Sequence, residues 1–174
     1  MTDFQIHGIS IDENLLDHFT RNEIKKNSVF LEQAKGNKEF KRYEIYENTG
    51  EYDKVSILYK NFDQSFPIAT IEGIKWFKDD IESCLKKRDE IIKELKSFFK
   101  DKQFYDAKKN THFADKNSYT YDYYVIFGDL KDPTVDHILI SCYDWSKKLK
   151  YQDHLRIGII TKEYSKWLNK LAGK

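Results

Sequence analysis

The sequence predicts an α+β fold, in which an antiparallel β-sheet of about six strands carries helices packed on one face, in two layers. Three observations lead to this prediction. Six short runs have the strand-like composition and apolar alternation of half-buried strands. One longer segment repeats its apolar residues every three or four positions, as an amphipathic helix does. Short turns separate most consecutive runs, which favours antiparallel meanders covered by helices.

The N-terminal region should contain a short strand followed by two short helices. Residues 4–11 have a strand-like composition, and Asp12 then stands where an N-cap would begin a helix. Residues 22–27 can start a second helix. Residues 28–38 are ambiguous and end in a turn at the Gly36-Asn37 pair.

Three strands should complete the first half of the chain. They lie at residues 39–47, 54–60 and 67–77, and the alternation is clearest in the second of them. Gly73 interrupts the third run. A glycine inside a strand pattern suggests a bulge or a bend.

The segment from Asp79 to Phe99 predicts a long amphipathic helix capped by Asp79 or Asp80. Its apolar face consists of residues at helical spacing: Ile81, Cys84, Leu85, Ile91, Ile92, Leu95, Phe98 and Phe99. Charged residues occupy the other positions, as expected for a helix with one side on the sheet and one in solvent.

The second half should contain three more strands and a closing helix. Residues 100–118 are polar and predict a loop with a short strand in it. Strand-like runs follow at residues 119–128, 137–145 and 155–162. The helix begins near Lys162, and its apolar stripe consists of Tyr164, Trp167, Leu168 and Leu171.

The length of 174 residues predicts a single domain, residues 1–174, whose core is large enough for folding without disulfides or bound metals. Helices followed by three strands occur twice, so the element order suggests an internal duplication with halves near 1–78 and 79–174. This ααβββ-type order resembles the tandem repeat of β-lactamase inhibitor proteins and of small lipoproteins of outer-membrane assembly. No residue motif of those families occurs in the chain, so the resemblance concerns the fold alone.

The composition favours a cytoplasmic protein that does not bind nucleic acid as its main role. The formal net charge is +1 and the pI is about 7.7, without the basic excess typical of nucleic-acid binders. The chain has no signal-like N-terminus and no apolar run long enough to span a membrane, so we expect no membrane contact. Lysine-, asparagine- and isoleucine-rich usage is typical of an A/T-rich genome, and we expect a bacterial source.

The two cysteines should be buried core residues with free thiols. Cys142 continues a row of isoleucines on one face of its strand, and Cys84 lies on the apolar face of the long helix. Both therefore point toward the seam between helix and sheet. A disulfide between them is the less favoured alternative, because a reducing compartment keeps thiols free.

The sequence contains none of the common catalytic or cofactor motifs. The five histidines form no H-x-H or H-x-x-x-H pair and the cysteines no C-x-x-C pair, so we expect no metal. Glycine-rich phosphate loops and the G-x-S-x-G elbow are also missing, so we expect no nucleotide cofactor. We assign no catalytic residue; the missing motifs favour a non-enzymatic protein, and a small enzyme stays open as the alternative.

Aromatic residues among lysines are the most informative functional feature. They lie in the strands at 119–128 and 137–145 and directly after the second, and we expect the uncovered sheet face to present them to a partner, because Tyr and Trp anchor many interfaces. The candidate binding residues are Tyr124, Tyr143, Trp145, Lys147, Lys148 and Tyr151. The simpler interpretation, in which tyrosines only pack in the sheet, stays open.

Two functions are therefore predicted. The first is a protein-interaction module of inhibitor, immunity or adaptor type that uses this aromatic and lysine face, with another protein as partner. The alternative is a small enzyme or small-molecule-binding protein with a pocket between sheet and helix, where Asp144 and His154 lie at a strand end. Stacking of nucleic-acid bases on the aromatic residues ranks third.

Overall fold

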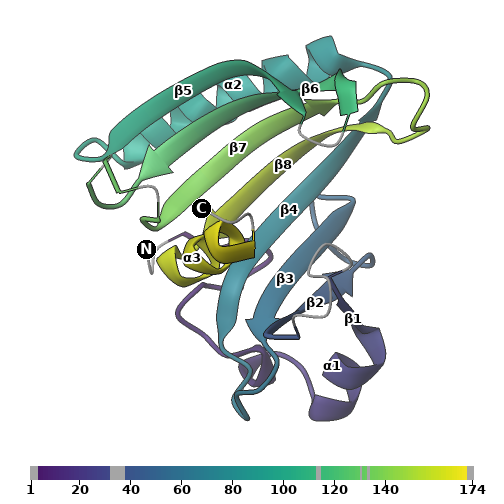
Figure 1. The fold of residues 1–174 in the computed structure, drawn as a ribbon, viewed down its shortest axis with the longest axis vertical. Coiled ribbons are helices and arrows are strands. Elements are labelled where there is room, and N and C mark those ends of the chain that lie inside the picture. Colours follow the sequence, from purple (N-terminus) through teal and green to yellow (C-terminus); the bar gives the residue numbers. More distant parts are fainter. Residues whose placement is uncertain (1–3, 32–37, 113–114, 130, 133, 172–174) are drawn as a thin grey trace.

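The computed structural model contains one antiparallel sheet of eight strands (Figure 1). It describes residues 4–31, 38–112, 115–129, 131–132 and 134–171. The strands are β1 (Ser28–Phe30), β2 (Phe40–Ile45), β3 (Lys54–Lys60), β4 (Ile68–Lys78), β5 (Gln103–His112), β6 (Asp115–Ile126), β7 (His137–Asp144) and β8 (Asp153–Ile160). The helices are the 3-10 helix η1 (Leu15–Asp17), α1 (Arg21–Asn27), α2 (Ile81–Phe98) and α3 (Lys162–Leu171). In the part of the chain described, no helix combines the length and the apolar content needed to cross a membrane.

The sheet consists of two four-stranded meanders joined side by side. Its strand order is β1-β2-β3-β4-β8-β7-β6-β5, and β4 pairs with β8 at the join. The α+β class and the antiparallel sheet are confirmed. The number of strands is eight instead of about six, and each meander has four strands instead of three. Only α2 precedes the second meander, so the predicted ααβββ repeat does not match the structure in detail.

The strands beyond the six predicted runs are the edge strands β1, which was not predicted, and β5, which lies where only a short strand within a loop was expected. β5 covers most of the polar segment that was expected to be largely loop, and its residues are mainly exposed. An edge strand with both faces exposed needs no apolar alternation, and charged residues there discourage pairing with other chains. β1 has three residues, too few to show a pattern.

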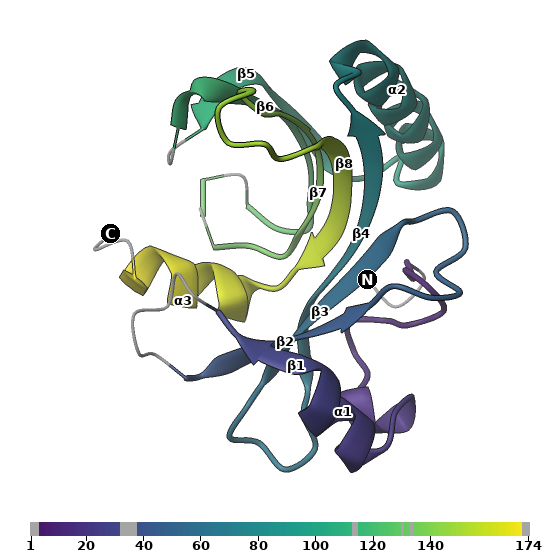
Figure 2. The same cartoon turned by 90° about the vertical axis from the view of Figure 1, so that its right-hand side faces the viewer.

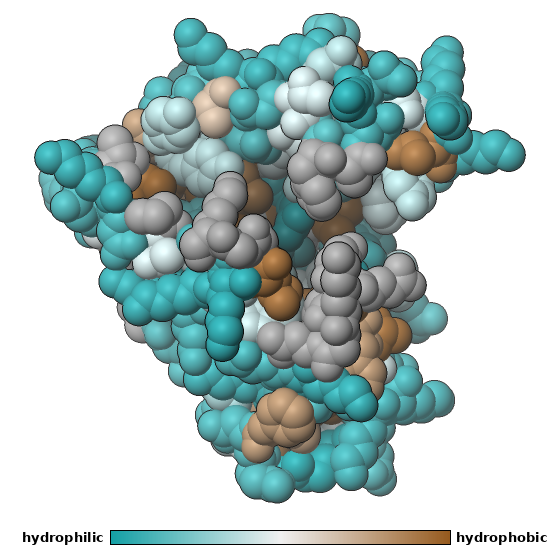
Figure 3. All heavy atoms as spheres, in the orientation of Figure 1, coloured by the Kyte–Doolittle hydropathy of each residue, from teal (hydrophilic) through white to brown (hydrophobic). Residues whose placement is uncertain are grey.

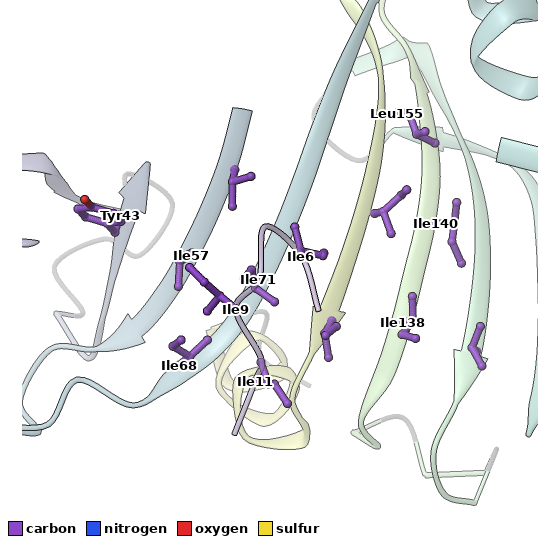
Figure 4. Close-up of a cluster of buried hydrophobic side chains, with 14 of the residues drawn as sticks. Ile6, Ile9, Ile11, Tyr43, Ile57, Ile68, Ile71, Ile138, Ile140 and Leu155 are labelled. Carbon is purple, nitrogen blue, oxygen red and sulfur yellow. The ribbon is translucent and has the colours of Figure 1, made fainter. Parts of the chain in front are cut away.

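The main core lies between the sheet and α2. Cys84, Ile92 and Leu95 of the helix are buried in one cluster with Ile140 of β7 and Leu155 of β8. Figure 4 shows how isoleucines of the N-terminal segment and of both meanders point into the same layer. The predicted amphipathic helix is thus confirmed, and Asp80 is its N-cap, accepting a hydrogen bond from the backbone N–H of Ser83 at 3.0 Å.

The helices do not all lie on one face of the sheet, as the sequence analysis expected. Figure 2 shows α2 and α3 on opposite sides. Tyr164 and Trp167 of α3 form a second cluster with Phe40, Leu58 and Ala69 of the first meander. Phe40 and Leu58 point away from α2 by the alternation of the sheet, and Ala69 lies at the register shift between β3 and β4. Without a cover these residues would be exposed to water, so the terminal helix buries them.

The N-terminal segment is more irregular than predicted. Residues 4–11 form a tight turn closed by backbone hydrogen bonds between Ile6 and Ile9, instead of a strand. Gly8, with a φ of +71°, supplies the left-handed conformation that this turn requires. The expected helix after Asp12 is reduced to η1, whose N-cap is Asn14.

Gly73 does not mark a bulge in β4. The register shifts in this part of the sheet lie between Leu58 and Tyr59 and between Trp76 and Lys78. Gly73 instead lies under the ring of Tyr52, where a Cβ atom would come within 2.5 Å of the ring. The glycine is therefore required for close packing.

The two cysteines form a disulfide bond, which corrects the expectation of free thiols. Both side chains are buried, as predicted, and they point into the seam between α2 and β7. Their Cα atoms lie 6.0 Å apart, within the usual range for a disulfide. The sequence pattern predicted that both sulfurs lie between helix and sheet. It did not predict where along β7 the helix residue Cys84 would lie.

Candidate functional site

A hollow of about 480 Å³ lies on the sheet face opposite α2, which we call the concave hollow. Figure 2 shows that the strands β5 to β8 curve around this side, and the loop between β7 and β8 lines the hollow with Trp145, Leu149 and Tyr151. The hollow is lined by residues of β2, β3, β4, β5, β7, β8 and that loop: Arg42, Lys54, Ser56, Glu72, Ile74, His112, Tyr143, Trp145, Leu149, Tyr151, His154 and Arg156.

The alternation of β8 explains why these side chains gather here. Leu155 and Ile157 point into the core under α2, so His154 and Arg156 point to the other face. Figure 3 looks onto this side of the molecule. Hydrophilic residues cover most of it, and hydrophobic residues appear between them in small separate areas.

Aromatic rings form one wall of the concave hollow. The rings of Tyr143 and His154 are stacked, with centroids 4.5 Å apart and an interplanar angle of 11°. Trp145 lies 5.6 Å from Tyr143 in a stacked arrangement, and Tyr151 meets Trp145 edge-on at 5.1 Å. These contacts hold the rings in fixed orientations, so their outer faces form a preformed apolar surface.

A buried ion pair forms the floor. Arg156 of β8 donates one hydrogen bond to the carboxylate of Glu72 and another, 3.1 Å long, to the hydroxyl of Tyr143. Glu72 is only 4% exposed. Burial disfavours the charged guanidinium, but the attraction of Glu72 outweighs it and raises the pKa of Arg156. Gly158 makes room for this pair, because a Cβ atom there would lie 2.8 Å from Cγ of Glu72.

A second charged group lies on the wall formed by β2 and β3. Lys54 donates a hydrogen bond of 2.8 Å to Glu44, and the hydroxyl of Tyr46 donates another to the second oxygen of the same carboxylate. These partners lower the pKa of Glu44 although burial alone would raise it. Arg42 lies 3.9 Å from Glu44, beyond hydrogen-bond distance.

The two histidines of the hollow favour the uncharged form. Burial, assisted by the charges of Arg156 and Lys54, lowers the pKa of His154 to about 4. Burial also lowers the pKa of His112. At neutral pH both rings therefore contribute aromatic surface and hydrogen-bonding nitrogens instead of positive charge.

Four residues named from the sequence meet at this site. Tyr143, Trp145 and Tyr151 were candidates for a binding face, and His154 was a candidate for a pocket; all four line the concave hollow. The pocket lies on the face opposite α2, not between the sheet and that helix. A smaller hollow of about 160 Å³ does lie beside α2, between Ile91, Leu95 and the sheet.

The other named residues lie elsewhere. Lys147 borders a shallow depression beside the loop, and Lys148 is exposed. Asp144 does not line the concave hollow, because the alternation of β7 places it on the face of Cys142. Tyr124 lines a separate hollow of about 430 Å³ with Tyr105, and burial raises its pKa.

Sequence reasoning missed the charged residues of the site, above all Arg42, Glu72 and Arg156. One signal was present, because Glu72 and Arg156 each interrupt an otherwise apolar strand run. A charged residue in a strand that is buried on both faces needs a partner. Pairing them required the register of β4 with β8, which sequence alone does not supply.

The arrangement suits recognition by stacking and hydrogen bonding. Within the described ranges, no three His, Cys, Asp or Glu side chains lie close enough to hold a metal ion. No protein-family model, curated protein or solved structure matches this chain. Its function is therefore inferred from the geometry of the site.

Proposed function

We propose that this chain is a non-enzymatic binding protein that holds a compact ligand with a planar ring in the concave hollow. The observation that carries the proposal is the fixed cluster of Tyr143, Trp145, Tyr151 and His154 around a hollow of about 480 Å³. Small-molecule sites typically have volumes of about 300–1,000 Å³ and combine apolar walls with a few polar groups.

The polar groups of the hollow support binding over catalysis. Glu72, Arg156 and the hydroxyl of Tyr143 hold one another in place, an arrangement that fixes a ligand's orientation. The sequence lacks the G-x-S-x-G elbow and the glycine-rich phosphate loops of common enzyme classes.

A fragment screen by ligand-observed NMR tests the proposal. We expect compounds with planar rings to bind the wild-type protein. Binding should weaken at least fivefold in Trp145→Ala, because one wall of the hollow is lost. Phe62→Ala is the matched control, since Phe62 is an aromatic residue that is 73% exposed outside the hollow. If no fragment binds, or if Trp145→Ala binds as the wild type does, the proposal is wrong.

The protein-interaction module predicted from the sequence is the second candidate. Three exposed aromatic residues at the rim favour it: Tyr46, 61% exposed, donates to Glu44; Trp76, 38% exposed, meets the ring of His154; and Tyr151, 61% exposed, lines the hollow at its outer edge. A protein partner would use these rim residues, whereas a small ligand would contact the wall inside. A Tyr46→Ala, Trp76→Ala double variant should therefore lose a protein partner and still bind the fragments.

The predicted cytoplasmic location also remains a proposal. The disulfide favours an oxidising compartment, whereas the composition favours a reducing one. Thiol labelling of protein extracted from the source cells under acid quench distinguishes the two. Labelling at both Cys84 and Cys142 supports the cytoplasm, and labelling at neither contradicts it.

A further inference from the structure

Resting on the proposed function, we infer that the ligand of the concave hollow carries a single anionic group, a carboxylate, which Arg42 binds. The planar ring belongs to the proposed function, and the carboxylate is what is added here. The observation behind it is that positively charged side chains outnumber carboxylates around the hollow.

Arg42 is a cation without a hydrogen-bonded partner. Its side chain is 33% exposed, its Nε atom is buried, and among the described residues no group accepts a hydrogen bond from its guanidinium. The nearest carboxylate, Glu44, accepts hydrogen bonds from Lys54 and Tyr46, and Arg42 forms only a long ion pair of 3.9 Å with it. Arg42 thus keeps its donors for another acceptor.

The remaining charges of the hollow point to the same ligand chemistry. Arg42, Lys54 and Arg156 line it with positive charge, and Glu72 is the lining carboxylate. Glu72 is matched by Arg156 and Glu44 by Lys54. Arg42 and Lys54 share Glu44, so one positive charge is left over, and Arg42 is the cation without a hydrogen bond to a carboxylate.

A partly buried guanidinium costs free energy until an anion and its hydrogen bonds compensate it. The planar fork of arginine matches a carboxylate with two parallel hydrogen bonds. Because the surplus is a single charge, a monoanion completes the balance, whereas a dianion would leave an excess negative charge beside Glu44. The ligand class is thus a planar ring that carries one carboxylate.

Isothermal titration with three compounds that share one ring tests this inference. The compounds are 2-naphthoate, 2-naphthyl phosphate and the neutral 2-naphthylmethanol, measured at neutral pH. We expect the carboxylate to bind at least tenfold tighter than the alcohol and also tighter than the phosphate. In Arg42→Gln the carboxylate should lose at least fivefold in affinity, and the alcohol should bind as before.

Arg21→Gln is the matched control, because it removes the same charge where Arg21 donates to the backbone of Gln64, outside the hollow. Equal affinities for carboxylate and alcohol, or an unchanged carboxylate affinity in Arg42→Gln, would overturn the inference and leave the proposed function standing. Tighter binding of the phosphate would overturn the assignment of a carboxylate. If none of the three compounds binds, the proposed function is contradicted as well.

Discussion

His154 both packs against the ring of Tyr143 and lines the hollow. Its Nδ1 atom lies 3.3 Å from Nε1 of Trp145 and 3.1 Å from the carbonyl oxygen of Gln152. The Trp145 N–H can donate only to an unprotonated Nδ1, whereas the carbonyl can accept only from a protonated one. The two hydrogen bonds therefore belong to different tautomers of a neutral ring, and a ligand that contacts the other nitrogen would select between them.

The burial of this neutral imidazole predicts a loss of stability in mild acid. The pKa of His154 is lowered from 6.5 to about 4, so the unfolded chain binds a proton more readily than the folded one between these values. Stability contributed by the neutral ring is complete above pH 6.5 and is lost as the pH falls toward 4. The free energy of unfolding should drop by roughly 1–3 kcal/mol more in the wild type than in His154→Gln between pH 7 and pH 4.5.

Urea denaturation of both proteins at the two pH values measures this difference. Other carboxylates and histidines titrate in both proteins, so their contribution cancels in the comparison. Parallel pH dependence in wild type and His154→Gln would show that the ring is not held neutral by the fold.

The ion pair on the floor predicts a large asymmetry between single and double substitutions. Glu72→Gln leaves the guanidinium of Arg156 without its carboxylate and should lower the free energy of unfolding by about 3–5 kcal/mol. A Glu72→Leu, Arg156→Met double variant removes both charges and should be more stable than the single variant, because no uncompensated charge remains. Chemical denaturation of the three proteins checks the order. A single variant as stable as the wild type would mean that the pair is hydrated.

At the scale of the secondary-structure elements, predictability followed burial. The bounds of β3 were predicted without error, and α2 to within two residues at its start, because each has one clear apolar period. The edge strand β5 lacks that period and was predicted mainly as loop. The turn at residues 6–9 was predicted as a strand, because its isoleucines are buried by tertiary contacts and not by pairing in a sheet.

The candidate site was predictable in part for the same reason. Tyr143, Trp145 and Tyr151 stood out because they lie within nine residues of one another along the chain. Arg42 and Glu72 come from other strands, and they line the same hollow only through the order β2-β3-β4-β8. Sequence patterns report which face a residue takes, but not which strand lies beside it.

The disulfide predicts how firmly α2 is held on the sheet. It links residues 58 positions apart, and closing a loop of this size in the unfolded chain contributes about 4 kcal/mol to stability. A Cys84→Ala, Cys142→Ala double variant should therefore unfold at a lower denaturant concentration than the oxidised wild type. Dithiothreitol should destabilise the wild type by a similar amount and leave the variant unchanged. Insensitivity of the wild type to complete reduction would contradict the prediction.

At the scale of the whole molecule, each half of the chain completes the core of the other. Ile57 and Ile71 of the first meander share the main core with Ile140 and Ile159 of the second. In the opposite direction, α3 follows the second meander but covers Phe40, Leu58 and Ala69 of the first. The halves 1–78 and 79–174 therefore do not have separate cores, although the strands are arranged as two meanders.

This shared core predicts one cooperative unfolding transition for residues 1–174. Separating the meanders would break the β4–β8 pairing and expose both clusters at once, so neither half should keep its structure alone. Hydrogen exchange at increasing denaturant, read by mass spectrometry, can compare peptides from β3 and β7. Their protected amides should converge on the same free energy of opening. If β3 opens at a clearly lower free energy while β7 stays protected, the two meanders are independent units and the main core does not couple them.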